Sequence, residues 1–126
     1  MPISSHTDSS KELTTLTATG GVTFEEIIEV VKGFKDDPPE KNILWDYCEA
    51  YPEDRFDAED MDRIAALAKT NLNLRNQANG KTAFVATSDF IFGLARMYTT
   101  YLELLGPSHD IQVFRSLGEA HQWLAE

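Results

Sequence analysis

Two side chains that could act as a nucleophile or an acid follow the second apolar segment of the sequence. Asp46 and Cys48 come just after Ile43-Leu44-Trp45, a run that predicts a buried strand. A cysteine past a strand end can serve as a nucleophile in an α/β enzyme, but no histidine base lies near Cys48 in the sequence. Free cysteines commonly pack as small hydrophobes, and we favour that role for Cys48.

Asp46 can also be compared with the aspartate that accepts phosphate in response regulators. That site needs an acidic pair after the first strand to hold a divalent metal, and a lysine after the last strand. Here the first predicted strand is followed by Thr19-Gly20-Gly21 and the last ends in Phe114-Arg115. We therefore do not expect receiver chemistry at Asp46.

The segment Thr87-Ser88-Asp89 lies between an apolar strand and a predicted helix, where α/β folds often bind anions through unpaired backbone N–H groups. Ser88 is also a good helix N-cap, and Asp89 already places a negative charge at the helix start. No glycine-rich loop brings the backbone close to a phosphate there. We expect a cap at this position and no anion site.

The histidines do not combine into a metal site. His6, His109 and His121 fall in an N-terminal tail, a loop and the last predicted helix, without the spacing of a ligand set. The single cysteine excludes a disulfide framework and a multi-cysteine zinc site. We expect no metal, no cofactor and no catalytic residue.

Acidic residues are concentrated in one part of the chain. The 126 residues carry 11 Lys and Arg against 21 Asp and Glu, a net charge of −10, which argues against nucleic acid as a partner. Residues 36–62 hold eleven of the acids and only Lys41 and Arg55 as cations. Two interpretations remain open: solvation with favourable acids at a helix start, or a docking face for a basic protein partner at Glu53, Asp54, Asp57, Glu59 and Asp60.

Alternating and helical patterns divide the chain into strands and helices. Apolar segments predict strands over residues 13–18, 43–45, 83–86 and 111–114. Helical spacing and capping signals predict helices over residues 24–34, 58–79, 89–105 and 117–124. Gly20-Gly21 is expected to end the first of these strands, and residues 47–57 to form an irregular connection broken at Pro52, with Asp57 as the next N-cap.

This order predicts a single α/β domain over residues 1–126. Strands that alternate with helical segments imply right-handed crossovers onto a mostly parallel sheet of four or five strands, with about four helices. Residues 1–10 form either a short extra strand, turned at Ser9-Ser10, or a flexible tail. The start of the chain lacks a basic and apolar leader and no apolar run could span a membrane, so we expect a cytoplasmic protein without a membrane partner.

The last strand and helix, with the helix before them, resemble a known family. Phe92-Gly93-Leu94-Ala95-Arg96-Met97-Tyr98, then Val113-Phe114-Arg115-Ser116-Leu117, Glu119-Ala120 and Trp123-Leu124, are similar to the SpoIIAA-like (STAS/Sec14-type) family of small bacterial α/β proteins. The resemblance runs from about residue 12 to 125. It implies a mixed sheet with an antiparallel N-terminal strand, no cofactor and usually no assigned activity.

The resemblance favours a non-enzymatic regulatory or protein-interaction module. In the related anti-sigma factor antagonists a serine after a buried strand accepts phosphate, but the matching stretch Tyr47-Cys48-Glu49-Ala50 has no serine or threonine. We therefore expect no phosphorylation switch there. The Sec14-type kinship leaves an alternative open, a carrier of a small apolar, lipid-like ligand with Tyr47, Tyr51 and Phe56 at the rim of its pocket.

The predicted helix over residues 89–105 is apolar on nearly all sides, which indicates burial on more than one side. One side must pack on the sheet. The other is covered either by a second copy of the chain, through Phe92, Arg96, Thr99 and Glu103, or by the last helix or the 47–57 segment. Five residues are expected to be largely buried in the core: Trp45, Phe84, Val85, Leu94 and Trp123.

Overall fold

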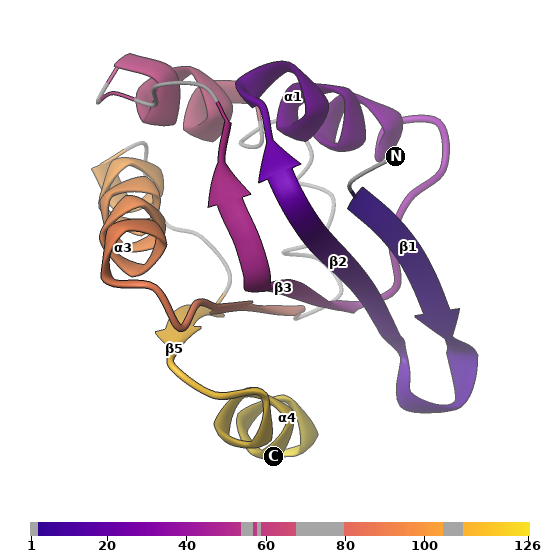
Figure 1. Cartoon of the computed structure of the whole chain (residues 1–126). Helices are drawn as coiled ribbons and strands as arrows, with labels where there is room; N and C mark the ends of the chain where they lie inside the picture. Colours follow the sequence, from indigo (N-terminus) through magenta and orange to yellow (C-terminus); the bar gives the residue numbers. More distant parts are fainter. Residues whose placement is uncertain (1–2, 54–56, 58, 68–79, 105–109) are drawn as a thin grey trace.

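The computed structural model of the chain describes residues 3–53, 57, 59–67, 80–104 and 110–126. Five strands form one sheet in sequence order (Figure 1): β1 (Ile3–Asp8), β2 (Leu13–Val22), β3 (Asn42–Pro52), β4 (Lys81–Val85) and β5 (Asp110–Phe114). β1 is antiparallel to β2, and all other neighbouring strands are parallel. This mostly parallel, mixed sheet confirms the expected fold class, and residues 3–8 form the extra strand.

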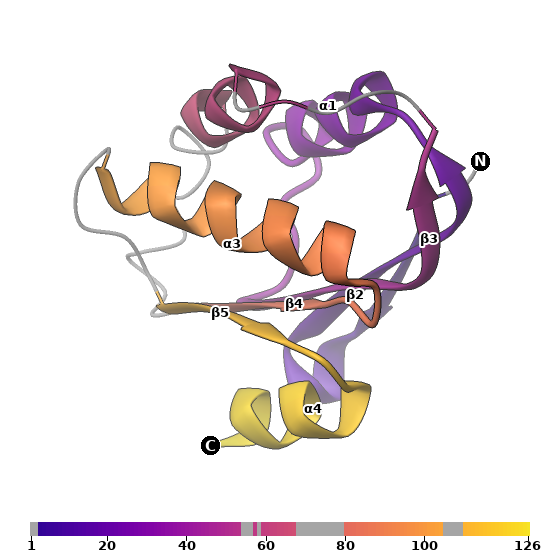
Figure 2. The same ribbon diagram turned by 60° about the vertical axis from the view of Figure 1, so that its left-hand side comes forward.

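Helices cover both faces of this sheet. They are α1 (Phe24–Gly33), the helical residues 59–67, α3 (Asp89–Leu104) and α4 (Leu117–Ala125). The short 3-10 helix η1 (Ser9–Lys11) lies in the connection between β1 and β2. Figure 2 shows α1, residues 59–67 and α3 on one face of the sheet and α4 on the other. Connections between adjacent parallel strands are right-handed, so connections that step across the sheet in one direction all lie on the same face of it. The helix α4 follows the last strand and is not part of such a connection, so it can pack on the opposite face.

The sheet separates two apolar clusters. On the α1 and α3 face, large side chains of β3 and β4, chiefly Trp45 and Phe84, pack with Ile91 and Ala95 of α3. On the α4 face, a smaller cluster joins Leu44 and Val85 to α4 through Ala120 and Leu124. Successive side chains of a strand point to opposite faces, which explains how β3 and β4 supply both clusters.

The predicted caps are present at the helix starts. Thr23 and Glu26 form a reciprocal capping box: Glu26 N donates to Thr23 Oγ1 at 3.2 Å, and Thr23 N donates to Glu26 Oε1 at 2.8 Å. Asp57 accepts from Asp60 N at 2.9 Å, ahead of the helical residues 59–67. The remainder of the helix predicted to run to residue 79 lies outside the described residues.

Two strand ends were predicted wrongly. β2 continues through Gly20-Gly21 to Val22, because Gly20 adopts a φ of 75°, which lets the strand bend without ending. β3 continues through residues 47–52, which were expected to be irregular. β3 ends at Pro52, because proline has no backbone N–H to donate to a neighbouring strand.

A β-bulge explains why the pattern of β3 was missed. Thr17 pairs with Asp46 and Thr19 with Glu49, so Tyr47 and Cys48 together lie opposite the single residue between the two threonines. The extra residue breaks the alternation of β3, and the sequence there reads as irregular. Beyond the bulge β3 is paired only with β2, because β4 pairs with it no further than Asp46.

Burial agrees with the expected core only in part. Trp45, Phe84 and Val85 are buried, with 5%, 6% and 0% of their surface exposed. Leu94 and Trp123 were expected to be largely buried but are only half-buried. Both lie at an open margin: Leu94 lines a cavity, and Trp123 lies beneath the side chain of Lys81.

Candidate functional site

The part of β3 beyond the bulge forms one wall of a cavity. α1, helical residues 59–67 and α3 form the rest, on the face of the sheet opposite α4. The cavity has a volume of about 80 Å³ and is lined almost entirely by apolar side chains: Val22, Ile27, Val31, Trp45, Tyr47, Ala50, Tyr51, Pro52, Met61, Ile64, Phe84, Ile91, Leu94, Ala95 and Tyr98. The space lies where the β2–β3 pair extends past the end of β4 and where no further strand of the described residues fills the layer beneath α3.

Aromatic rings give the cavity a rigid floor. Trp45 stacks on Tyr47 on one side, with centroids 6.0 Å apart, and on Phe84 on the other, at 6.3 Å. Tyr98 of α3 meets the Phe84 ring edge to face at 5.4 Å. Such ring pairs hold defined orientations and add stabilisation beyond the area they bury. The floor is therefore a fixed surface across two strands and a helix.

Tyr47 is the most unusual polar group of this lining. Burial raises the pKa of its phenol well above the usual value, and the nearby Tyr98 raises it further. No hydrogen bond joins the Tyr47 hydroxyl to another residue within the described ranges. A desolvated hydroxyl without a partner costs free energy, and a ligand or water that offers a polar atom here would recover it.

The cavity includes part of the pocket rim expected from the sequence. Tyr47 and Tyr51 both line it, and Tyr51 remains 59% exposed. Phe56 lies outside the described residues. Met61, Ile64 and Leu94 also line the cavity but were not predicted to do so, because helical spacing signals burial equally well in a core or beside a cavity.

Cys48 belongs to the other side of the sheet. It packs at the margin of the α4 cluster, and its backbone N–H donates to Asp46 Oδ1 at 3.0 Å. Burial, followed by the hydrogen bond and charge of Asp46, raises the pKa of the thiol to about 11. The thiol is thus protonated at neutral pH and is a poor nucleophile, because the thiolate is the reactive form.

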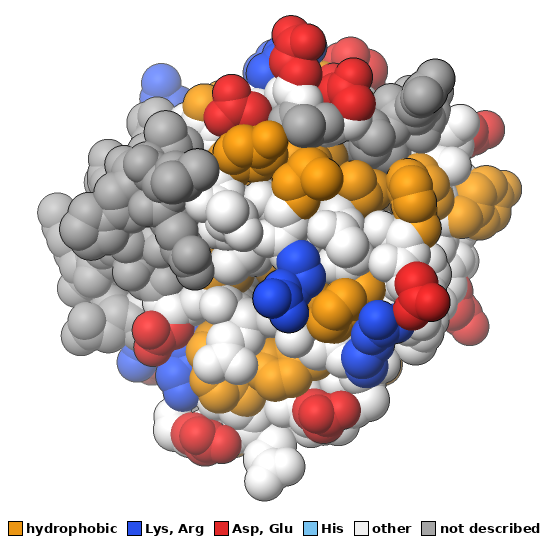
Figure 3. Space-filling view, turned by 90° about the vertical axis from the view of Figure 1, so that its left-hand side faces the viewer, with side chains coloured by type: hydrophobic (Ala, Val, Ile, Leu, Met, Phe, Trp, Pro, Cys, Tyr) orange, Lys and Arg blue, Asp and Glu red, His pale blue; other side chains and the backbone are white. Residues whose placement is uncertain are grey.

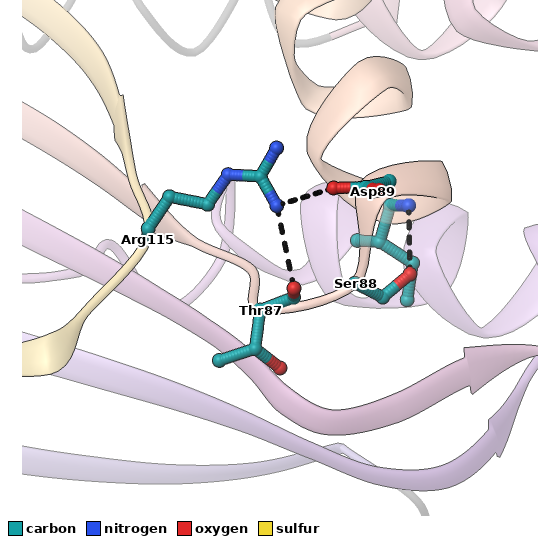
Figure 4. A network of polar contacts seen from close by, with 5 residues as sticks. Thr87, Ser88, Asp89 and Arg115 are labelled. Atoms are coloured by element: carbon teal, nitrogen blue, oxygen red, sulfur yellow. Dashed lines mark hydrogen bonds and ion pairs between the residues drawn. The ribbon is translucent and has the colours of Figure 1, made fainter.

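A polar network closes the start of α3 (Figure 4). Ser88 Oγ accepts from Ile91 N at 3.3 Å, which is the expected cap. Arg115, at the end of β5, donates to Asp89 Oδ1 at 2.8 Å and to the Thr87 carbonyl at 3.3 Å. Ser88 and Asp89 therefore already have partners, and a cation adjoins Asp89. No pattern in the sequence indicated that Arg115 would join this network.

Arg115 also covers part of the expected dimer face. Its guanidinium carbon lies 3.9 Å from the centre of the Phe92 ring, a cation–π contact within one chain. Arg96 is exposed, and Thr99 Oγ1 donates to the Ala95 carbonyl at 2.9 Å. Nothing is described of the Glu103 side chain. Among the α3 side chains that the structure describes, the most exposed large apolar one is Phe90, at 55%.

The acidic residues singled out in the sequence surround the start of helical residues 59–67. Glu53, Asp57 and Glu59 are exposed. The backbone N–H of Asp60 donates to the Asp57 carboxylate, and the Asp60 carboxylate accepts from Asp57 N at 3.2 Å. Asp54 lies outside the described residues. Within the described ranges, no three His, Cys, Asp or Glu side chains are grouped to hold a metal ion, and none of the described helices is long and apolar enough to cross a membrane.

Comparison with known proteins defines the fold. No protein-family model and no curated protein matches the chain. Among solved structures, the chain is similar to an uncharacterized protein of the DUF3478 family from Shewanella loihica PV-4, which has a SpoIIAA-like fold. The two are 16% identical, with a TM-score of 0.52, over 97% of this chain and 91% of that one. The chain therefore has a SpoIIAA-like fold, and the resemblance drawn from the sequence is confirmed at the level of the fold.

Proposed function

We propose that the protein is a non-enzymatic binding protein that takes a small, mostly apolar molecule into the cavity between α1, residues 59–67, α3 and the β2–β3 pair. This was the alternative function inferred from the sequence. The observation that carries it is the cavity itself, an open apolar site whose aromatic floor contains the Tyr47 hydroxyl, which has no hydrogen-bond partner among the described residues. Apolar lining with a few polar groups is the usual composition of small-molecule sites.

The cavity suits a short alkyl chain or a single ring. Its volume of about 80 Å³ is several times the roughly 10–15 Å³ that one water molecule needs. It is well below the several hundred Å³ typical of sites for drug-sized ligands. A ligand with an alkyl portion in the cavity and a polar group toward the mouth matches this size, and 1-octanol is a simple probe of that form.

The proposal that the protein is not an enzyme rests on the protonation of Cys48 and on the composition of the described cavity lining. Cys48 is protonated at neutral pH and packs on the α4 face of the sheet, away from the cavity. Among the described residues that line the cavity there is no carboxylate, histidine, lysine or thiol. Its composition supports binding and offers no acid–base pair for a reaction.

Titration of the protein with 1-octanol, followed by NMR, tests the binding function. Ala95 is buried and lines the cavity, so Ala95→Leu adds carbon atoms to the space the ligand needs. Gly93→Leu is the matched control, because this position of the same helix has open space around it. We expect octanol to bind the wild type and Gly93→Leu alike and to bind Ala95→Leu at least about tenfold more weakly, a difference of about 1.4 kcal/mol. Equal binding by all three proteins would refute the site.

A second candidate function, a regulatory or protein-interaction module that includes a homodimer, is favoured by two exposed aromatic residues. Tyr51 and Phe90 are 59% and 55% exposed, and aromatic residues are enriched at protein interfaces. Sedimentation equilibrium at micromolar concentration tests the dimer. A dimer mass that Phe90→Glu reduces to a monomer supports it, and a monomer mass across the concentration range rules it out.

A further inference from the structure

Tyr47 is a residue of the cavity lining whose hydroxyl has unused hydrogen-bonding capacity. The residue lines the cavity and its ring stacks on that of Trp45, with only 9° between the two planes. Within the described ranges, no residue forms a hydrogen bond with the Tyr47 hydroxyl. A desolvated hydroxyl that stays unpaired costs free energy, and a ligand that supplies the missing partner recovers this cost when it binds.

Tyr47 lies between the buried and the open part of the β3 wall. The exposed fraction of the aromatic lining residues on β3 rises from 5% at Trp45 to 59% at Tyr51, and Tyr47 between them is half-buried. A ligand that packs its apolar part against Trp45 and Phe84 therefore passes Tyr47 on the way to the mouth. A polar atom placed directly after that apolar part is then nearest to Tyr47.

The Tyr47 hydroxyl remains a hydrogen-bond donor at neutral pH. Burial, and then the neighbouring Tyr98, raise the pKa of this phenol well above the usual value, so it keeps its proton. Both causes disfavour negative charge at this point of the cavity. The same surroundings therefore disfavour a carboxylate on the ligand and favour an uncharged oxygen that accepts a hydrogen bond.

Charged side chains of both signs lie on the surface near α3. Figure 3 shows a row of hydrophobic side chains on this side of the molecule, with Lys and Arg side chains as well as Asp and Glu side chains near it. This surface therefore favours neither sign of charge on a ligand. We look for the selection in the cavity lining, whose described side chains are all uncharged.

We propose that the cavity binds small uncharged molecules that place a hydrogen-bond-accepting oxygen, such as the carbonyl of an aryl ketone or ester, against the Tyr47 hydroxyl. This inference rests on the proposed binding function and adds the chemical class of its ligand. The aromatic part of the lining suits a ring, because aromatic pairs gain stabilisation beyond the area they bury. The Tyr47 hydroxyl supplies the polar contact that fixes the orientation of the ligand.

Three aromatic probes of similar size test the inference: acetophenone has a carbonyl oxygen, α-methylstyrene has a methylene group in its place, and benzoate has a carboxylate. Each is titrated by NMR at neutral pH into the wild type and into Tyr47→Phe, which removes only the hydroxyl. We expect the wild type to bind benzoate at least about tenfold more weakly than acetophenone. Tyr47→Phe should weaken acetophenone binding about five- to tenfold, and α-methylstyrene should bind this variant at least as tightly as the wild type.

Tyr51→Phe is the matched control, because Tyr51 also lines the cavity but is 59% exposed, so water reaches its side chain. This variant should keep the wild-type affinity for all three probes. The binding of α-methylstyrene to Tyr47→Phe shows that the cavity of that variant is intact.

Three results would overturn the inference: acetophenone binding that Tyr47→Phe leaves unchanged, an equal loss of acetophenone binding in Tyr51→Phe, or benzoate binding as tightly as acetophenone in the wild type. The comparison of benzoate with acetophenone needs no variant, so it tests the inference even where a substitution prevents folding. Failure of the wild type to bind either acetophenone or α-methylstyrene would instead contradict the proposed function.

Discussion

The Phe84 ring links two strands and a helix at the floor of the cavity. It is buried, stacks on Trp45 and meets the ring of Tyr98. Phe84→Ala should lower the free energy of unfolding by about 3–5 kcal/mol, through lost transfer free energy and the space left behind. Chemical denaturation measures this change.

Phe90→Ala provides the control for that substitution, because Phe90 is 55% exposed. Truncation of an exposed side chain should change the free energy of unfolding by no more than about 0.5 kcal/mol. Equal effects of the two substitutions would contradict the placement of β4 in the core.

Cys48 should react slowly with thiol reagents. Its pKa of about 11 leaves little thiolate at neutral pH, and raising the pH toward that value increases the reactive fraction. We expect the alkylation rate with iodoacetamide to keep rising between pH 8 and pH 10, below the rate of a free cysteine throughout. Asp46→Asn should increase the rate at pH 8, because it removes a charge that opposes the thiolate. A rate that levels off by pH 8 would show that the pKa of the Cys48 thiol is not raised.

Contacts of single residues also show what could and what could not be predicted from the sequence. Tyr47 and Tyr51 could be placed near a pocket because aromatic residues cluster there. The contact of Arg115 with Phe92, Asp89 and the Thr87 carbonyl could not be predicted, since it depends on β4 and β5 lying side by side. These residues are far apart in the sequence, and they come into contact only because of the order of the strands in the sheet.

At the level of elements, helix starts were the most predictable features. Capping is local chemistry: Thr23 with Glu26, and Ser116 ahead of α4, satisfy N–H groups within a few residues. The length of β3 was not predictable, because its bulge depends on pairing with β2 and interrupts the two-residue alternation. That same bulge sets the course of β3 along the cavity wall.

Gly93 provides a test of α3. It lies in the interior of this helix, and a methyl group added to it would meet nothing within 4 Å. Gly93→Ala should raise the free energy of unfolding by about 0.5–1 kcal/mol, because alanine restricts the unfolded chain and favours the helix. Thermal and urea denaturation measure the gain. A loss of stability would mean that this side of α3 is covered.

At the scale of the whole molecule, the sheet separates two environments. The α4 face is a small, closed cluster in which Lys81 Nζ donates to the Trp123 and Glu126 carbonyls, each at 3.0 Å, and so fastens the end of the helix. The opposite face carries more helices and the cavity. The strand–helix order predicted this layered fold, but not the cavity, which arises where β3 extends beyond β4.

The measurement that tests binding most directly is an NMR experiment that detects contacts between bound 1-octanol and side-chain methyl groups. We expect intermolecular contacts to Val31, Ile64 and Leu94, which line the cavity, and none to Leu44 and Leu124 in the α4 cluster. Ala95→Leu should remove these contacts while Gly93→Leu keeps them. Contacts confined to the α4 face, or an absence of contacts at saturating octanol, would contradict the proposal that this cavity is the binding site.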